Sequence, residues 1–392
     1  MNKPSLRINS VDIVRGLVMI IMALDHVRDL YYADSLTSDP LNLQATTPAL
    51  FFTRWVTHLC APVFVFLSGV SAYLSFSRNK NYVQSRNFLV RRGLWLILLE
   101  FTVVNFGVWA DIRFSVVIFQ VIGAIGCGFI LLGLLIKLSP KVIGISAVIL
   151  VIVLNAVALP PFFYDGFLKN IPQPLVALVS PQVMQARQTT FLLVYPPLAW
   201  TAIMLMGFAV APWLFTGGAG RKKRFLRTGL VLLVLFLALR FFNSYGDTAP
   251  WSAQATPLYT VLSFINLTKY PPTLLFQLLF LGIMFLLLAA FENRQNRFTR
   301  TLTVYGRVPL FYYILHWYLI HPGLFLLLFI QGYGMADFRF GFNLGRPEGP
   351  SGLPLAGVYL VWVTVVLILY PLCRWYEKYK FSHPEKKWLR YL

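Results

Sequence analysis

Long apolar runs divide this chain, and each is about 20 residues long, the length that an α-helix needs to cross the hydrocarbon of a bilayer. Only 12% of the residues are charged, whereas soluble domains carry roughly 25%. The apolar windows are 11–30, 51–76, 88–109, 113–136, 142–159, 191–215, 226–242, 272–291, 303–331 and 355–373. The sequence therefore predicts an all-α polytopic membrane protein of about ten transmembrane helices, with one domain over residues 1–392.

The 34 Lys and Arg residues are concentrated in the short segments between these runs. If the N-terminus is cytoplasmic, 23 of them fall in the cytoplasmic segments 1–10, 77–92, 137–141, 221–227, 292–300 and 374–392. The outer loops hold six, namely Arg113, Lys169, Arg187, Lys269, Arg339 and Arg346. Because cytoplasmic loops are enriched in Lys and Arg, this split predicts an even number of helices with both termini in the cytoplasm. We expect a multi-pass protein of the cell (inner) membrane, and its net charge of +20 requires no nucleic-acid partner.

Two predicted outer loops, 160–190 and 243–271, are long and rich in Pro, aromatic and polar residues. Loops of this length are usually functional or disordered. The stretch "TPLYTVLSFINLTKYPPTLLF" (256–276) is too apolar for a solvated linker. We expect part of it to enter the outer leaflet or to cap a cavity.

The first apolar window carries several ionisable residues, although each such group in hydrocarbon costs several kcal/mol. Helical spacing puts one stripe of residues on a single face: Asp12, Arg15, Met19, Met22, His26 and Asp29. Arg15 and His26 are about 16 Å apart along the axis, with His26 in the outer half. His26 is a candidate general base, with Asp29 or Asp25 orienting its imidazole. A buried structural ion pair is the alternative interpretation of this stripe.

Two other windows carry histidines at a similar depth. Arg54 and His58 are one turn apart in the second window, and Tyr313 precedes His316 by about one turn in the ninth. His321 follows near the outer end of the ninth window. Four of the five histidines are therefore expected to converge near the outer face. A structural interhelical hydrogen bond remains the alternative for His58 and His321.

Several familiar catalytic and binding motifs are absent from the sequence. It has three cysteines without a C-x-x-C pair, and no H-E-x-x-H spacing that would support a metal site. It also lacks a P-loop and a G-x-S-x-G motif, which argues against an ATP-driven pump and a serine hydrolase.

The opening stretch "SVDIVRGLVMIIMALDH" resembles the first helix of transmembrane acyltransferases, in which an Arg-Gly pair is followed by a His. Acyltransferase family 3 has the same Arg-x10-His pattern, matched here by Arg15 and His26. The chain is more similar to the bacterial branch of the heparan-α-glucosaminide N-acetyltransferase catalytic-domain family. The segments that carry this resemblance are "APVFVFLSG" (61–69), "YPPLAWTAIMLMGF" (195–208), "LTKYPPTLLF" (267–276), "YGRVPLFYYILHWYLIH" (305–321) and "YPLCRWYEKYK" (370–380).

This resemblance implies that acyl-CoA binds from the cytoplasm and passes its acyl group, which we expect to be acetyl, to a hydroxyl or amine of a sugar or glycolipid at the outer face. Acyl-CoA would be a co-substrate, with no permanently bound cofactor and no metal. The expected partners are the lipid bilayer, acyl-CoA and the acceptor, and a homodimer is left open. The residues expected to bind substrate are Arg15, Arg54, His58, Lys269, Tyr270, Arg307, Tyr313 and His316. Those considered for the nucleotide phosphates are Arg91, Arg92, Arg221 and Lys222.

Two questions stay open at this point. In the lysosomal members the position of His26 is an Asn, and their proposed catalytic His lies in a region that corresponds to residues 31–57, which contain no His here. Either His26 or His58 is therefore the base, and the neighbouring carboxylates favour His26. The alternative function is a transporter or flippase that uses intramembrane His and Arg for protons or anions.

Overall fold

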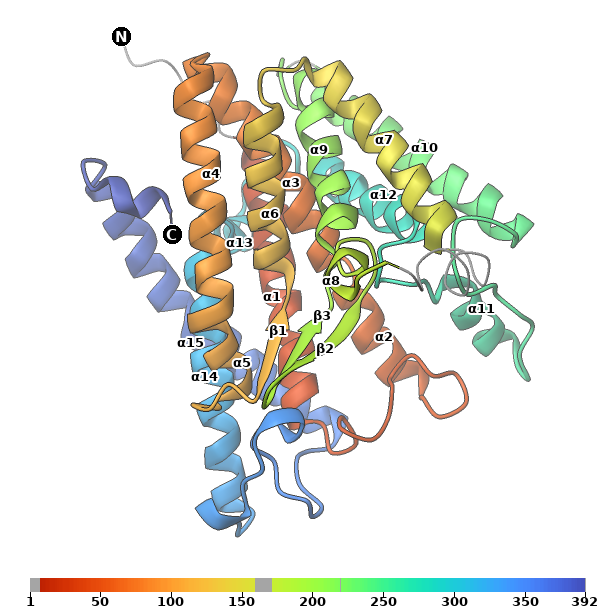
Figure 1. Ribbon diagram of the computed structural model, residues 1–392, viewed down its shortest axis with the longest axis vertical. Helices are drawn as coiled ribbons and strands as arrows, with labels where there is room; N and C mark the ends of the chain where they lie inside the picture. Colours follow the sequence, from red (N-terminus) through yellow and green to blue (C-terminus); the bar gives the residue numbers. More distant parts are fainter. Residues whose placement is uncertain (1–7, 159–170, 219, 392) are drawn as a thin grey trace.

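The computed structural model describes residues 8–158, 171–218 and 220–391. These residues form a predominantly helical, multi-pass membrane protein, in which α1 runs through the middle of the bundle (Figure 1). The helices of the bundle are α1 (Asn9–Tyr31), α2 (Pro48–Thr57), α3 (Cys60–Asn79), α4 (Tyr82–Leu99), α5 (Asn105–Trp109), α6 (Val121–Leu135), α7 (Pro140–Ala158), α9 (Pro197–Leu214), α10 (Arg221–Phe242), α12 (Leu274–Phe291), α13 (Arg297–Arg307), α14 (Pro309–Ile330) and α15 (Leu355–Ser382). A π-helical segment, η1 (Glu100–Val104), joins α4 to α5, and the short helices α8 (Gln173–Val176) and α11 (Pro257–Ile265) lie in connections.

Six helical segments of the described chain are long and apolar enough to cross a membrane, judged by length and composition. They are Pro48–Arg78, Pro197–Leu214, Arg221–Phe242, Leu274–Phe291, Pro309–Ile330 and Leu355–Ser382. The apolar helices α6 and α7 are shorter than this criterion requires. Each predicted window contains a helix, but ten complete spans and cytoplasmic termini remain predictions.

The prediction of a helical membrane protein is confirmed in its main part, but the chain is not all-α, because it also contains a three-stranded sheet with the order β1-β3-β2. β1 (Val116–Phe119) pairs in parallel with β3 (Thr189–Leu193), and β3 pairs antiparallel with β2 (Gln182–Ala186). β1 and the end of β3 fall within the predicted helical windows 113–136 and 191–215. A hydropathy window measures apolarity and not backbone conformation, and the β1 sequence VVIF is rich in β-branched residues, which favour strands.

The second and ninth predicted windows are each divided into two helices. α2 and α3 meet at His58 and Leu59, because Pro62 has no N–H to donate to the carbonyl of His58. α13 and α14 meet at Val308, which has φ −129° and ψ 48°. The proline that follows it, Pro309, disfavours helical backbone at the preceding residue.

The backbones of α1 and α13 are in direct contact. A Cβ atom on Gly16 would lie 1.8 Å from the carbonyl oxygen of Leu302, and one on Gly306 would lie 1.8 Å from the carbonyl oxygen of Asp12. Only glycine allows two helices to approach this closely. The Gly of the Arg-Gly pair therefore serves the packing of α1, and it fixes where the side chains of α1 lie.

Hydrogen bonds join three of the predicted outer segments at one end of the bundle. The Arg346 guanidinium donates to the carbonyl oxygen of Tyr32 at 2.8 Å, which ties the α14–α15 connection to the end of α1. The Asn266 side chain donates to the carbonyl oxygen of Leu41 at 3.1 Å, which adds the segment after α11. We call the joined segments 32–47, 243–273 and 331–354 the cap.

Predicted cytoplasmic segments meet at a different place. The Ser10 hydroxyl donates to Glu292 at 2.5 Å, and Arg221 Nε donates to the same carboxylate at 2.8 Å. These bonds join the start of α1, the end of α12 and the start of α10. The structure thus groups segments that the charge distribution assigns to one side.

We predict that a single cysteine at position 247, in a background without native cysteines, reacts with a membrane-impermeant thiol reagent in intact cells. Cysteines at 80 and 223 should react only after the membrane is permeabilised. Their reaction at that stage is the control that shows that both cysteines can react. Labelling of either in intact cells contradicts the predicted orientation. Position 165, which the sequence also places outside, is beyond the described residues, as is Lys169.

We also predict that Gly16→Ala lowers the thermal stability of the purified protein by about 1–3 kcal/mol, the usual cost of overpacking. The added methyl group would meet backbone atoms of α13, which cannot move aside as a side chain can. The measurement is the melting temperature in detergent. Gly218→Ala is the matched control, because no described atom lies within 4 Å of its added Cβ. Equal melting temperatures for the two variants would disprove the contact.

Candidate functional site

Two cavities adjoin along one side of α1. The first, called the large cavity, has a volume of about 600 Å³, and the second, called the small cavity, has a volume of about 260 Å³. Phe64, Val121 and Tyr313 line both cavities and form the wall between them. The two spaces are therefore separated by three side chains from α3, α6 and α14.

The predicted stripe on α1 faces these cavities. Arg15 and Met19 line the large cavity, whereas Met22, His26 and Asp29 line the small one. The helix thus carries its arginine and its histidine to two different spaces that share a wall. Asp12 points elsewhere, because it is buried beside Arg15 at 3.7 Å and Arg307 at 3.8 Å.

The His26 imidazole stands between an aromatic wall and the small cavity. Its ring centre is 4.1 Å from that of Trp317 and 5.2 Å from that of His316. Neither ring nitrogen of His26 has a hydrogen-bond partner among the described residues. The ring is therefore held by packing, and its nitrogens are available to a molecule in the cavity.

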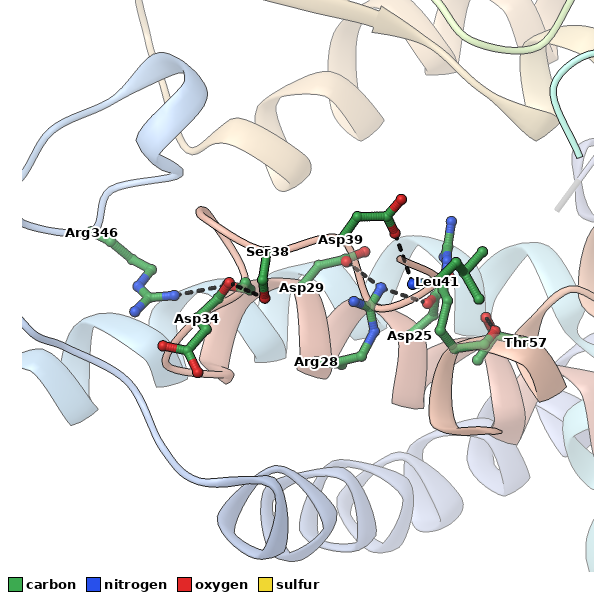
Figure 2. A network of polar contacts seen from close by, with 11 residues as sticks. Asp25, Arg28, Asp29, Asp34, Ser38, Asp39, Leu41, Thr57 and Arg346 are labelled. Atoms are coloured by element: carbon green, nitrogen blue, oxygen red, sulfur yellow. Dashed lines mark hydrogen bonds and ion pairs between the residues drawn. The ribbon is translucent and has the colours of Figure 1, made fainter. Parts of the chain in front are cut away.

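The carboxylates near His26 bind arginines (Figure 2). Asp25 accepts a hydrogen bond from Arg28 at 3.1 Å. It also forms a close ion pair with Arg54 of α2. Asp29 accepts a hydrogen bond from the same Arg28 at 2.5 Å. Within the described chain, neither carboxylate is hydrogen-bonded to His26. Their predicted role in orienting the imidazole therefore stays a prediction, whereas their role in neutralising the arginines is visible.

The large cavity combines basic groups with apolar walls. Arg15 donates to the Ser71 hydroxyl at 2.9 Å, so its guanidinium is fixed against α3. Arg92 and Lys380 also line the cavity, and the guanidinium carbon of Arg92 is 5.6 Å from the ring centre of Phe129. Arg307 lines the same space and donates to Glu377 at 2.7 Å. This arrangement suits a ligand with a charged end and a long, largely apolar arm.

Of the basic residues considered for the nucleotide phosphates, Arg92 is the one that lines the large cavity. Arg221 instead pairs with Glu292 in the contact between α10 and α12. Lys380, which the sequence analysis did not select, comes from the end of α15 and lines the cavity. Its position depends on how α15 packs, which local sequence patterns do not reveal.

The other intramembrane histidines occupy different surroundings. His58 is 1% exposed and packs against Phe276 and Phe280, with ring centres 5.7 and 5.8 Å away, and it lines neither cavity. His316 is buried behind His26, and its Nδ1 faces the carbonyl oxygen of Tyr313. His321 makes contacts of 3.2 and 3.0 Å with the carbonyl oxygens of Gly107 and Leu344, and so joins α5 to the cap. Of these four histidines, His26 lines one of the two cavities along α1, and the other three line neither of them.

The cap lines one part of the small cavity, which agrees with the expectation that the apolar stretch 256–276 caps a cavity. Lys269 and Tyr270 both line this cavity, and the Tyr270 hydroxyl donates to the Tyr195 hydroxyl at 3.2 Å. Arg54 lines it from α2. These three predicted binding residues are therefore brought together around one space, although they come from distant parts of the sequence.

Glu100 is a structural residue of the site that the sequence analysis missed. It is fully buried in η1 and accepts hydrogen bonds from the backbone N–H groups of Gln120 at 2.9 Å and Gly123 at 3.0 Å. These bonds hold the start of α6, whose first residue, Val121, belongs to the wall between the cavities. Glu100 lies inside the predicted window 88–109, so a lone acidic residue in an apolar run was the available signal, but it does not reveal which backbone groups the carboxylate binds.

Trp317 was also missed, although the residue before it was selected. It lines the small cavity, while His316 lies behind it. Neighbouring residues of an α-helix point about 100° apart. Selecting His316 in place of Trp317 therefore names a side chain that does not face the small cavity. The sequence analysis treated residues 303–331 as one helix. It therefore did not include the break at Val308, which changes the direction in which the side chains of α14 point.

The comparisons with known proteins give one positive result. The family profile described as "Heparan-alpha-glucosaminide N-acetyltransferase, catalytic" matches residues 7–239, which include α1, the wall residues Phe64 and Val121, and most of α10. A search of curated proteins found no match. Because the matched residues make up more than half of the chain, the protein belongs to the heparan-alpha-glucosaminide N-acetyltransferase catalytic-domain family, a family of membrane acetyltransferases.

Proposed function

We propose that this protein is an acyl-CoA-dependent acyltransferase of the cell membrane. It moves an acyl group, acetyl in the simplest case, from cytoplasmic acyl-CoA to a hydroxyl or amine of a sugar or glycolipid at the outer face. The observation that carries this proposal is the pair of adjoining cavities along α1, with Arg15 in one and His26 in the other.

The large cavity suits acyl-CoA in size and in chemistry. Arg15, Arg92 and Lys380 are suited to phosphate groups, and Ile122, Ile125 and Phe129 give the apolar wall that a pantetheine arm requires. Eleven residues at about 1.5 Å each separate Arg15 from His26 by about 16 Å, comparable with the length of an extended pantetheine arm. The thioester would then reach the wall between the cavities while the nucleotide stays at the far end.

In the reaction, the acceptor lies in the small cavity and His26 acts as the general base. An unpartnered imidazole nitrogen takes the proton from the acceptor O–H or N–H, and the acceptor atom attacks the thioester carbonyl carbon. The new C–O or C–N bond forms, the C–S bond breaks, and the CoA thiolate leaves and takes up the proton that His26 held, which restores the neutral imidazole. Tyr313 lines both cavities and is positioned beside the path of the acyl group.

His58 is the less favoured base on the same geometry. Its ring is enclosed by Phe276 and Phe280 and lines neither cavity. A general base must come within hydrogen-bond reach of the proton that it removes. His26 meets this requirement from its position in the small cavity, so we assign the base to His26.

We expect purified protein in nanodiscs to release free thiol from acetyl-CoA only after a sugar or glycolipid acceptor is added. The thiol is measured with a chromogenic disulfide, and the acylated acceptor by mass spectrometry. Arg91→Gln is a control that removes a basic residue outside both cavities. Uptake of an intact solute into vesicles, with no thioester cleavage for any acceptor, would favour the transporter instead.

We predict that His26→Ala lowers turnover by at least about 100-fold, because a positioned base contributes roughly 10²- to 10⁴-fold. Binding of acyl-CoA should change little, since His26 lies outside the large cavity. Turnover of the unmodified protein should fall as the pH is lowered, because only the neutral imidazole accepts a proton.

The matched control for this prediction is His58→Ala, measured for the same acceptor and with its melting temperature. We expect it to keep most of its turnover after any loss of folded protein is taken into account. If His26→Ala keeps near-normal turnover while His58→Ala or His316→Ala abolishes it, the base is misassigned and the stripe on α1 is structural.

A further inference from the structure

A third cavity lies where the start of α1, the helix α13 and the last part of α15 meet. We call it the arginine cavity, and its volume is about 420 Å³. Ile13 of α1, Thr303 of α13 and Tyr370 of α15 are among its lining residues. It has one lining residue, Arg307, in common with the large cavity and none in common with the small cavity. The proposed acyl transfer therefore leaves this space without a role.

The charges around the arginine cavity do not balance, because four arginines and one glutamate line it. The glutamate, Glu377, is engaged by Arg307, whose guanidinium donates to it at 2.7 Å. Among the described residues the other three arginines form no ion pair, and they are Arg294, Arg300 and Arg374. A cleft lined by one sign of charge concentrates ions of the opposite sign. The cavity is therefore suited to an anion.

The packing of α13 against α15 brings two of these arginines to one space. Arg300 and Arg307 are seven residues apart and so share one face of α13. Tyr370 and Arg374 are one turn apart on α15, and the ring centre of Tyr370 is 5.8 Å from that of Tyr305 of α13. The two helices thus present their basic faces to the same cavity.

The third arginine comes from the connection between α12 and α13. The backbone N–H of Arg294 donates to the carbonyl oxygen of Phe291 at 3.2 Å. The Asn296 side chain accepts from the backbone N–H of Thr299 at 2.8 Å, and the Thr299 hydroxyl accepts from that of Asn296 at 2.9 Å. This reciprocal cap fixes the first turn of α13. The connection that carries Arg294 is therefore short and anchored at both ends.

The arginine cavity lies beside a helix that faces lipid. In the described chain, α15 is the least buried of the six candidate spans. Trp375, the residue after Arg374, is 60% exposed, and exposed Trp side chains are enriched at the level of the lipid headgroups. The cavity also borders the segments 292–300 and 374–392, which the charge distribution assigns to the cytoplasmic side. A phospholipid beside α15 would bring its headgroup to this place.

We propose that the arginine cavity binds the phosphate-bearing headgroup of an anionic phospholipid, with Arg294, Arg300 and Arg374 as the counter-ions of the phosphate. The fork of a guanidinium matches two oxygens of a phosphate, and basic pockets between membrane helices suit such headgroups. The acyl chains lie along the exposed face of α15. This site does not depend on the proposed acyl transfer.

The size and the remaining lining of the cavity agree with a headgroup. Its volume of about 420 Å³ falls within the roughly 300–1,000 Å³ of typical small-molecule sites. Asn9, Gln295 and Thr303 offer polar groups for the hydroxyls of a glycerol headgroup. Because the lining comes from α1, α13 and α15, a bound headgroup joins three helices. A ligand that binds only the folded protein stabilises it, so binding should raise the melting temperature.

The test is a binding experiment on the full-length protein in a neutral detergent, with short-chain lipids. Phosphatidylglycerol is titrated in parallel with phosphatidylcholine of the same acyl chains, and binding is followed by native mass spectrometry and by thermal shift. Both lipids carry a phosphate, but only phosphatidylglycerol has a net negative charge, so we expect it to bind at least about 10-fold more tightly. Glycerol 3-phosphate should bind more weakly than the lipid, and acetyl-CoA should not displace the lipid.

Two matched pairs of substitutions assign the preference to the cavity. The cavity pair, Arg300→Gln with Arg374→Gln, should lower the affinity for phosphatidylglycerol about 25-fold, because each basic residue near an anionic headgroup contributes roughly fivefold. The control pair, Arg297→Gln with Lys378→Gln, removes the same charge from the same two helices, but neither residue lines the cavity. It should change the affinity less than about twofold, since salt screens exposed charges away from the bound group.

The melting temperature without lipid shows whether each pair is folded, and the single variants serve if the cavity pair is not. The proposal is overturned if the two lipids bind the unmodified protein equally, or if the folded cavity variants keep the preference. Equal losses in the two pairs also overturn it, because the whole basic surface would then attract the lipid. Binding of glycerol 3-phosphate as tight as that of the lipid rejects a lipid site, and displacement of the lipid by acetyl-CoA rejects a site separate from that of the donor.

Discussion

The pairing of charges on α1 is the constraint on which the rest of the site depends. Moving an unpaired ion out of water costs several kcal/mol even after the protein relaxes, and breaking a buried pair costs about 3–5 kcal/mol. Asp25 is buried and is neutralised by Arg28 of the same helix and by Arg54 of α2. Because α1 cannot satisfy its own charges, it must lie where neighbouring helices supply the partners, and that place is the middle of the bundle (Figure 1).

The contact between α1 and α13 extends this dependence to the large cavity. Gly16 and Gly306 let the two backbones touch, and Arg307, the next residue on α13, comes within 3.8 Å of Asp12. Arg307 also pairs with Glu377 of α15. The same packing therefore positions α1, α13 and α15, and the cavity-lining residues Arg15 and Lys380 depend on it together.

A feature of the fold or of the site was predictable from the sequence where it depends on residues close together in the chain, and not where it depends on residues far apart. The separation of Arg15 and His26 is close to three helical turns, so sequence spacing alone placed them on one face, and they do border adjoining cavities. The sheet was not predictable from hydropathy, because apolar strands and apolar helices give the same signal. Lys269 was selected through a family resemblance, but its place beside the small cavity follows from contacts of the cap, which no local pattern contains.

Under the proposed function, the wall between the cavities has a physical reason. Acyl-CoA carries several phosphate charges, and each charge in hydrocarbon costs several kcal/mol, so carrying the whole donor across the membrane would be very costly. An acetyl group is small and neutral. If donor and acceptor enter from opposite ends, only this group needs to pass Phe64, Val121 and Tyr313. The charged groups of the donor then stay beside Arg15 and Arg92, so two cavities that share three side chains suit this chemistry better than one continuous pore.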